Sequence, residues 1–216
     1  MKLSKRSNTM LACYIGFQII AASLMFILMT KYTKNIDENS FKRFLIGFLV
    51  YVFIFLTPVI IYLKYIDKVN ILTYLKLKTN IGKGIIYGLL IGALYITLFC
   101  FKQKMHINGF NIGIYRYLSG ALVGVFEEIP FRGFLMQKLN EKMNFWVANI
   151  ITAVIFASMH IPYWIVFGGN IVNGIISIIM IAVIFGYAFK KTGSLWTVII
   201  AHSLYDLGIW IIVGYK

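Results

Sequence analysis

The stretch Glu127-Glu128-Ile129-Pro130-Phe131-Arg132-Gly133 places two adjacent carboxylates and an arginine inside an otherwise apolar part of the sequence. The whole chain has only seven acidic residues, and the segment 118–126 before this pair is uncharged. Because a charge at bilayer depth costs at least ~3 kcal/mol, these carboxylates need a partner. Arg132, five residues after Glu127 and four after Glu128, is placed to neutralise one of them. The other carboxylate would then remain available for proton chemistry.

The composition defines the class of protein. Hydrophobic residues make up 60% of the 216 residues, charged residues 13%, and the mean hydropathy is +0.82. Soluble domains are nearer a quarter charged, so the chain is expected to be a multi-pass membrane protein. Its net charge of +14 lies mainly between apolar runs, where Lys and Arg set topology and contact anionic lipid. We therefore expect the lipid bilayer as a partner and no nucleic acid. Cys13 and Cys100 are expected to be packing residues.

The apolar runs predict an all-α transmembrane helical bundle with about seven spans, six or eight being possible. Pro58 lies inside one run and requires a neighbour to bond the carbonyl that it frees. Pro130 should kink or end its helix. The lysine-rich segment 64–83 suggests an amphipathic surface segment. The expected spans are approximately 10–30, 44–63, 84–101, 112–134, 145–167, 171–189 and 195–213.

Orientation follows from the distribution of Lys and Arg. With the N-terminus inside, inner segments hold 13 of these residues and outer segments hold 8. We therefore expect a cytoplasmic N-terminus in a cell membrane, and the Lys-, Ile- and Asn-rich composition suggests a bacterial source. The basic start is expected to lead into a retained first span, because no cleavage signal closes its apolar run. No repeat or linker divides the chain, so 1–216 is expected to be a single domain.

Two histidines complete a constellation of ionisable groups on three separate predicted spans. Phe156 and His160 are four residues apart, as are His202 and Asp206, so each pair shares a helix face. Structural interpretations remain open: a histidine bonded to a backbone carbonyl, a polar clamp between helices, or an Arg132 that reaches the head groups. If the three spans meet, Glu127, His160 and His202 should line one cavity. Ser158 and Ser203 are expected to be packing residues and not nucleophiles.

The order and spacing of these groups resemble the CPBP family of intramembrane CAAX proteases and bacteriocin-processing enzymes, also called the ABI family. Its motifs are EExxxR, FxxxH and HxxxN or HxxxD. They correspond here to Glu127, Glu128 and Arg132, to Phe156 and His160, and to His202 and Asp206. The resemblance covers approximately residues 115–210.

The resemblance implies an intramembrane endopeptidase that hydrolyses a peptide or membrane-protein substrate. In such enzymes the residues matching Glu127 and His160 activate a water, and the residue matching His202 stabilises the oxyanion. Where some members have Asn, this chain has Asp206, and an ionised carboxylate would repel an oxyanion. We therefore expect Asp206 to orient His202 and to stabilise its positive form.

Three alternatives remain open. Glu127, His160 and His202 form a His2Glu set of the kind that binds catalytic zinc, although no HExxH motif pre-arranges two of them. A metal-free site without a cofactor is the leading expectation, and a zinc-dependent peptidase is the variant. A second function is a non-catalytic immunity or regulatory protein, in which the polar cluster is structural. A third is a proton-coupled transporter that uses the buried groups as relays.

Overall fold

The computed structural model describes residues 5–33, 35–37, 39–102 and 113–212. Most of the connector after Lys102, including His106, lies outside these ranges. The described residues are helical with turns and contain no strand, which confirms the all-α membrane bundle. The principal helices are α1 (Lys5–Thr33), α2 (Phe41–Tyr51), α3 (Thr57–Ile61), α5 (Ile81–Lys102), α6 (Ile114–Glu128), α8 (Phe145–Ser158), α9 (Ile161–Phe167), α10 (Ile171–Thr192) and α11 (Trp196–Ile212). Three π-helical segments, η1 (Val52–Leu56), η2 (Tyr62–Ile66) and η3 (Ile129–Met136), and the short helices α4 (Ile71–Tyr74) and α7 (Gln137–Asn140) complete the fold.

Within the described residues, each of the seven predicted spans falls on one helix or on successive helices. Within the described residues, four stretches are long and apolar enough to cross a membrane, namely 41–66, 81–101, 145–166 and 171–192. The number of spans therefore stays a prediction. The run at 145–167 differs from expectation because it is divided into α8 and α9 at Met159 and His160, just before Pro162.

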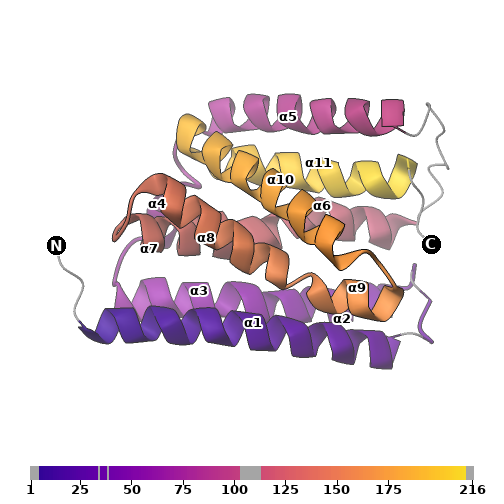
Figure 1. Ribbon diagram of the computed structural model, residues 1–216, viewed down its shortest axis with the longest axis horizontal. Coiled ribbons are helices and arrows are strands. Elements are labelled where there is room, and N and C mark those ends of the chain that lie inside the picture. Colours follow the sequence, from indigo (N-terminus) through magenta and orange to yellow (C-terminus); the bar gives the residue numbers. More distant parts are fainter. Residues whose placement is uncertain (1–4, 34, 38, 103–112, 213–216) are drawn as a thin grey trace.

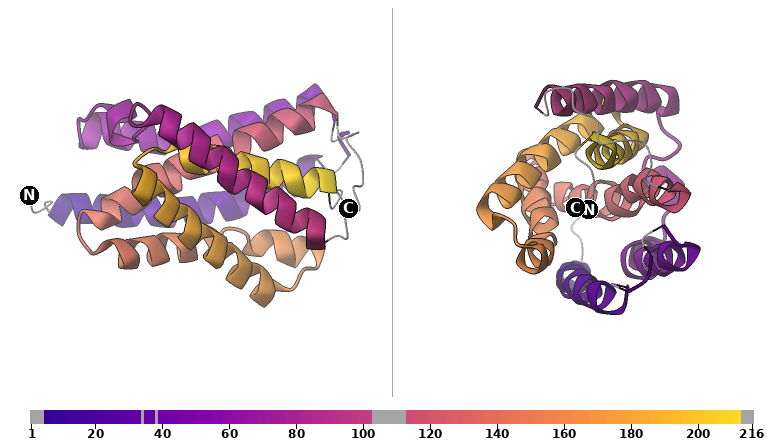
Figure 2. Two further views of the ribbon diagram at one scale, coloured as in Figure 1. Left: turned by 90° about the horizontal axis from the view of Figure 1, so that it is seen from above. Right: turned by 90° about the vertical axis from the view of Figure 1, so that its right-hand side faces the viewer.

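The helix formed by α6 and η3 occupies the middle of the bundle. It packs against α2, η1, α3, α8, α10 and α11, and the end-on view shows helices surrounding it (Figures 1 and 2). On the other side of α11, α5 approaches closely through Gly84, Gly88 and Gly92, where an added Cβ would lie 2.4–2.8 Å from α11 or the residues before it. Small residues spaced by four let membrane helices pack at short distance. This packing fixes α11, which carries His202, against α6.

A neighbouring helix bonds the carbonyl that Pro58 leaves without a donor. Its ring leaves the carbonyl of Ile54, four residues earlier, without its helical donor. The side chain of Gln18 on α1 donates Nε2–H to that carbonyl oxygen at 3.0 Å. The neighbouring helix therefore satisfies the freed group and joins α1 to the helix of residues 41–66.

Pro130 does not end its helix. The α-helical pattern stops at Glu128, and the chain continues as the π-helix η3. Proline cannot donate to the carbonyl four residues earlier, so a wider turn is compatible with this position. The change of pitch occurs directly after the two glutamates, and π-helical turns are frequent at functional sites.

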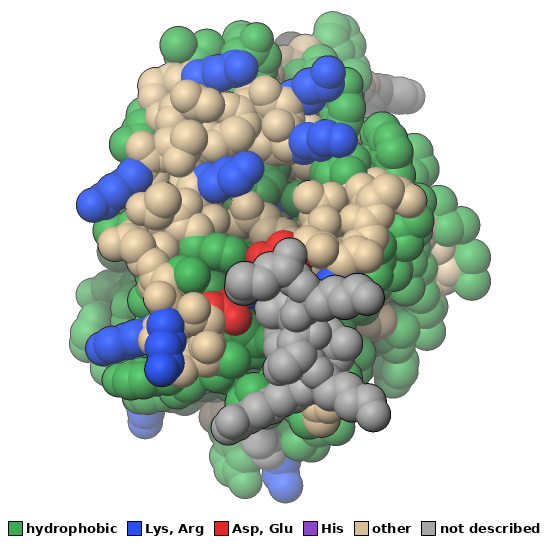
Figure 3. Space-filling view, turned by 90° about the vertical axis from the view of Figure 1, so that its left-hand side faces the viewer, with side chains coloured by type: hydrophobic (Ala, Val, Ile, Leu, Met, Phe, Trp, Pro, Cys, Tyr) green, Lys and Arg blue, Asp and Glu red, His purple; other side chains and the backbone are tan. Residues whose placement is uncertain are grey.

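The segment 64–83 lies at the surface of the bundle between η2 and α5. Ile71–Tyr74 forms a separate short helix in it, and Leu75 is its one buried residue. Leu77 O accepts from Trp196 Nε1 at 2.9 Å, and Tyr74 O accepts from Gln137 Nε2 at 2.9 Å. These hydrogen bonds and the burial of Leu75 hold one side of the segment on the bundle while most of its lysines stay exposed, as expected of an amphipathic surface segment. Figure 3 shows Lys and Arg side chains spread over this end of the molecule.

Candidate functional site

The six residues singled out from the sequence come from four parts of the fold. Glu127 and Glu128 end α6, Arg132 lies in η3, and His160 stands between α8 and α9. His202 and Asp206 lie on α11. All except Glu128 line one cavity of about 550 Å³, which extends toward the end of the bundle where α2 and α6 begin. The expected meeting of Glu127, His160 and His202 in one cavity is thus confirmed.

Glu128 and Arg132 form a buried ion pair beneath this cavity. Arg132 Nη1 donates to Glu128 Oε1 at 2.9 Å, and both side chains are at most 1% exposed. Arg132 Nη2 also donates to Ala182 O at 3.3 Å, and its guanidinium lies over the ring of Phe156 at 4.7 Å. Arg132 therefore does not reach toward head groups. Its charge is compensated by Glu128 and its flat faces are covered by apolar rings.

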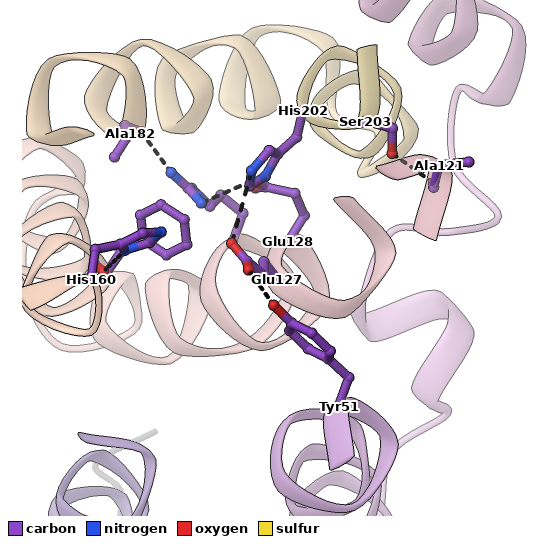
Figure 4. A network of polar contacts seen from close by, with 10 residues as sticks. Tyr51, Ala121, Glu127, Glu128, His160, Ala182, His202 and Ser203 are labelled. Atoms are coloured by element: carbon purple, nitrogen blue, oxygen red, sulfur yellow. Dashed lines mark hydrogen bonds and ion pairs between the residues drawn. The ribbon is translucent and has the colours of Figure 1, made fainter. Parts of the chain in front are cut away.

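His202 is anchored by the same carboxylate. Its Nδ1 lies 2.7 Å from Glu128 Oε1 (Figure 4). A carboxylate only accepts hydrogen bonds, so Nδ1 carries the proton and Nε2 is the nitrogen directed to the cavity. The orienting position that we expected for Asp206 belongs to Glu128. Among the described residues no hydrogen bond joins Asp206 to His202, and the Asp206 side chain lines the cavity instead.

Glu127 lies between two groups that face its two oxygens. Tyr51, the last residue of α2, donates its hydroxyl to Glu127 Oε1 at 3.2 Å. His202 Nε2 lies 3.8 Å from Glu127 Oε2, which is beyond hydrogen-bond distance but close enough for attraction. These contacts hold the carboxylate at the cavity wall with a small gap on the histidine side.

Tyr51 is the residue that the sequence reasoning missed. Its ring stacks on Phe126 with centroids 5.2 Å apart and an interplanar angle of 19°. The sequence held one clue, namely how far each residue lies along its helix. The two helices begin at the same end of the bundle, and Tyr51 is the tenth residue after Phe41 while Glu127 is the thirteenth after Ile114. A hydroxyl at the depth of a buried carboxylate is a candidate partner, but the sequence does not show that the two helices touch.

His160 has a defined tautomer when it is neutral. Its Nδ1 lies 3.0 Å from Phe156 O, a carbonyl that can only accept, so Nδ1 donates. The imidazole also contacts the ring of Phe156 at 5.0 Å. In the neutral ring Nε2 is then an acceptor. The expected structural role, a bond to a backbone carbonyl, is present, and the second nitrogen is left for chemistry.

The sequence suggests Glu127, His160 and His202 as possible zinc ligands. Within the described residues, no three side chains of His, Cys, Asp or Glu are grouped so that they could hold one ion. His202 Nδ1 donates to Glu128 and His160 Nδ1 donates to a carbonyl, which is the arrangement in which histidines bind metals through Nε2. Zinc binding by Glu127, His160 and His202 therefore stays an alternative proposal, and we derive no step through a metal.

The two serines near the histidines donate to backbone carbonyls. Ser158 Oγ donates to Ile155 O at 2.7 Å, and Ser203 Oγ donates to Ala121 O at 2.8 Å. The contact of Ser203 also crosses from α11 to α6, where Gly124 leaves room for close approach. Both hydroxyls thus stabilise helices and their packing, which agrees with their expected role.

The fold and the site together define a multi-pass membrane protein with a carboxylate and two histidines around a cavity inside the bundle. Residues 109–208 match the family of type II CAAX prenyl endopeptidases described as Rce1-like. This match confirms the resemblance to the CAAX-protease family, a family of proteases, and the matched segment contains all six predicted site residues. Neither a search of curated proteins nor one of solved structures found a match.

Proposed function

We propose that the protein is an intramembrane endopeptidase in which Glu127 and His160 activate a water. The observation that carries this proposal is the cavity in which Glu127, His160 and His202 meet, with the charge of Glu128 already taken up by Arg132 and His202. A carboxylate held by a single hydroxyl and facing a cavity retains lone pairs for a water. This is the requirement for a general base.

In the first step the water lies between Glu127 and His160. His160 Nε2 accepts one of its hydrogens and orients it, and the Glu127 carboxylate takes a proton as the water oxygen bonds to the peptide carbonyl carbon. The carbonyl oxygen becomes an oxyanion. His202 stabilises it by donating Nε2–H from the imidazolium form, which Glu128 supports at Nδ1. A donor in such a position typically contributes about 3 kcal/mol to the transition state.

In the second step the carbon–nitrogen bond breaks. Glu127 returns its proton to the leaving amine, and the oxyanion re-forms a carbonyl group, which gives a carboxylic acid and an amine. The acid then passes its remaining proton to water, so that a new C-terminal carboxylate and a new N-terminus result. Tyr51 keeps Glu127 in place during both proton transfers by its hydrogen bond to Oε1. Asp206 lines the same cavity and takes no part in these bonds.

The proposed substrate is a peptide or a membrane-associated protein segment. A cavity of about 550 Å³ is in the range of ligand sites that enclose most of a small molecule. It has apolar walls from α2, α6, α10 and α11, which suit an extended chain that enters from the bilayer. We further propose that the lysine-bearing end of the bundle and the N-terminus face the cytoplasm, in agreement with the distribution of positive charge.

The alternative function is that of an immunity or regulatory membrane protein without catalysis. It is supported by one observation: the network of Glu128, Arg132 and His202 joins α6, η3, α10 and α11 and would be valuable for stability alone. Glu127 is peripheral to that network. Its substitution therefore separates the two functions, because only a peptidase requires it.

The test is the cleavage of a mixed peptide library by the purified protein in liposomes, read by mass spectrometry. Wild type, Glu127→Gln and chelator-treated wild type are compared, with Glu141→Gln as a matched surface control. We expect new termini with wild type and Glu141→Gln, none with Glu127→Gln, and no effect of the chelator. Loss on chelation and recovery with zinc would instead establish the zinc-dependent variant. A cellular effect that survives Glu127→Gln, without cleavage by any sample, would favour the non-catalytic function.

A further inference from the structure

The first turn of α5 and the last turn of α10 meet at the lysine-bearing end of the bundle, the end that faces the viewer in Figure 3. Asn80, just before α5, donates Nδ2–H to Thr192 O at 2.9 Å. Lys83 Nζ donates to Lys191 O at 3.4 Å. These two hydrogen bonds hold the start of one helix beside the end of the other.

Each of these two helix ends presents one lysine and, one turn deeper, one tyrosine. Lys83 and Tyr87 are four residues apart on α5, and Tyr187 and Lys191 are four apart on α10, so each pair shares a helix face. Because α5 runs away from this end and α10 runs toward it, each tyrosine Cα lies about 6 Å deeper along its helix than the lysine Cα. All four side chains are exposed, and the ammonium groups lie 5.9 and 5.4 Å from the ring centroids on their own helices. The two helices thus present the same pair of groups side by side.

The two ammonium groups are not neutralised by the part of the chain that the structure describes. Asp67 and Glu141 lie at this end of the bundle, and both form ion pairs with Lys138. Lys83 contacts a backbone carbonyl and a ring, Lys191 contacts a ring, and no described carboxylate lies within ion-pair distance of either. Two neighbouring cations of this kind attract an anion from outside the chain.

We infer that Lys83 and Lys191 bind the phosphate of an anionic phospholipid at the junction of α5 and α10. Lysine binds phosphate as a point charge, and two lysines side by side match one phosphodiester. Basic residues between membrane helices on the cytoplasmic side bind anionic head groups, and this is the end of the bundle that we propose to be cytoplasmic. The inference concerns a lipid partner and is independent of the proposed peptidase function.

The helix faces below the tyrosines are suited to the acyl chains of such a lipid. Exposed apolar side chains continue the same helix faces away from the lysines, at spacings of three, four or seven residues. They are Ile86 and Leu90 on α5, and Ile184 and Met180 on α10. A phospholipid contacts both the lysines and these side chains, whereas a soluble phosphate contacts the lysines alone.

Aromatic side chains mark the depth of the membrane surface at this site. The exposed ring of Trp146 on α8 stacks on Tyr187, with centroids 5.7 Å apart and an interplanar angle of 10°. Lys190 Nζ lies 4.0 Å from the ring centroid of Phe145, the neighbour of Trp146. Trp and Tyr are enriched where the head groups meet the acyl chains. The rings therefore lie at that boundary, and the lysines one turn further out lie at the level of the phosphates.

The test measures lipid binding to the purified protein in detergent by native mass spectrometry. Anionic phosphatidylglycerol and zwitterionic phosphatidylcholine of equal chain length are titrated. The variants are Lys83→Gln, Lys191→Gln, the double change to Gln, and the double change to Arg, which keeps both charges. Lys31→Gln is the matched control, because Lys31 is also an exposed lysine, 5.7 Å from the ring of Tyr32, but lies at the opposite end of the bundle.

We expect wild type to bind phosphatidylglycerol about tenfold or more tightly than phosphatidylcholine. Each single change to Gln should weaken the binding of phosphatidylglycerol about fivefold, and the double change about thirtyfold. The double change to Arg and Lys31→Gln should leave this binding unchanged. Equal wild-type affinity for the two lipids, an unchanged affinity in the double Gln variant, or an equally large loss in Lys31→Gln would overturn the site.

Two further measurements locate the lipid and identify its source. A photoreactive phosphatidylglycerol is crosslinked to the protein in liposomes and the labelled residues are mapped. Labels on α5 and α10 near Tyr87 and Tyr187 support the site, and labels confined to other helices overturn it. Glycerophosphoglycerol carries the same phosphate without acyl chains and should not displace the lipid at equal concentration. If it does, the lysines bind a soluble phosphate and the assignment to a lipid is wrong.

Discussion

Removal of the Arg132 charge tests whether the buried ion pair stabilises the bundle as the geometry requires. In Arg132→Met the Glu128 carboxylate remains at 0% exposure and retains His202 as its partner, while the bond to Ala182 O is also lost. Removing one partner of a buried pair typically costs about 3–5 kcal/mol when the remaining charge is uncompensated, and the contact of Glu128 with His202 places Arg132→Met toward the lower end of this range. For a chain of this length that corresponds to a fall in melting temperature of roughly 6–20 °C.

The assay is thermal unfolding of the purified protein in detergent. Arg116→Met is the matched control, since Arg116 is half-buried at the cavity rim, 5.7 Å from the ring of Trp210, and should change stability far less. The double variant Arg132→Met/Glu128→Gln removes both charges and should recover most of the lost stability, whereas cleavage should stay impaired because His202 loses its anionic partner. An Arg132→Met protein as stable as wild type, or a double variant no more stable than the single one, would refute this account of the pair.

Three further predictions follow from other contacts. Tyr51→Phe keeps the stack on Phe126 but removes the hydrogen bond to Glu127, so cleavage should slow about tenfold while the melting temperature stays unchanged. The same change at Tyr95 is the control and should leave cleavage intact. Equal cleavage rates for both variants would contradict the positioning role of Tyr51. In Gly124→Ala the new Cβ would collide with Ile199 O and should separate α6 from α11. Thermal unfolding should then show a loss of stability of about 1–3 kcal/mol. Gly82→Ala is the control, since its Cβ meets nothing within 4 Å, and should be neutral. Burial lowers the pKa of Lys138, but its bonds to Asp67 and Glu141 outweigh this and raise that pKa. The stability advantage of wild type over Lys138→Met should therefore be constant from neutral pH to pH ~10.4 and decline above it. An advantage that grows with alkaline pH would contradict this sign.

The helical architecture could be predicted from the sequence because a membrane helix must bury its backbone bonds within one apolar segment. Segment length and hydropathy therefore locate the helices, and the described residues of all seven predicted segments are mainly helical. The pairing of Glu128 with Arg132 was predictable for a similar reason, since a spacing of four residues places both on one helix face. Local rules of this kind depend only on neighbours along the chain.

Contacts between segments far apart in the chain could not be predicted from the sequence. The bond from Glu128 to His202 spans 74 residues, and the bond from Tyr51 to Glu127 spans 76. Only the packing of α2 and α11 on α6 determines which donor reaches which oxygen. The sequence therefore suggested Asp206 as the partner of His202, its neighbour on the same helix, whereas the tertiary structure supplies Glu128. The π-helix after Pro130 could not be predicted either. A proline predicts that the helix is disturbed, but it does not predict whether the helix kinks, ends or widens.

The most direct test of the central claim is a cycle of cleavage rates with Glu127→Gln, His160→Ala and the double variant on one substrate. If both residues prepare the same water, each single change removes most of the rate, and the double variant is no slower than the slower single one. Multiplicative losses would show that the two residues act on separate steps. Cleavage by Glu127→Gln at the wild-type rate would contradict the account altogether.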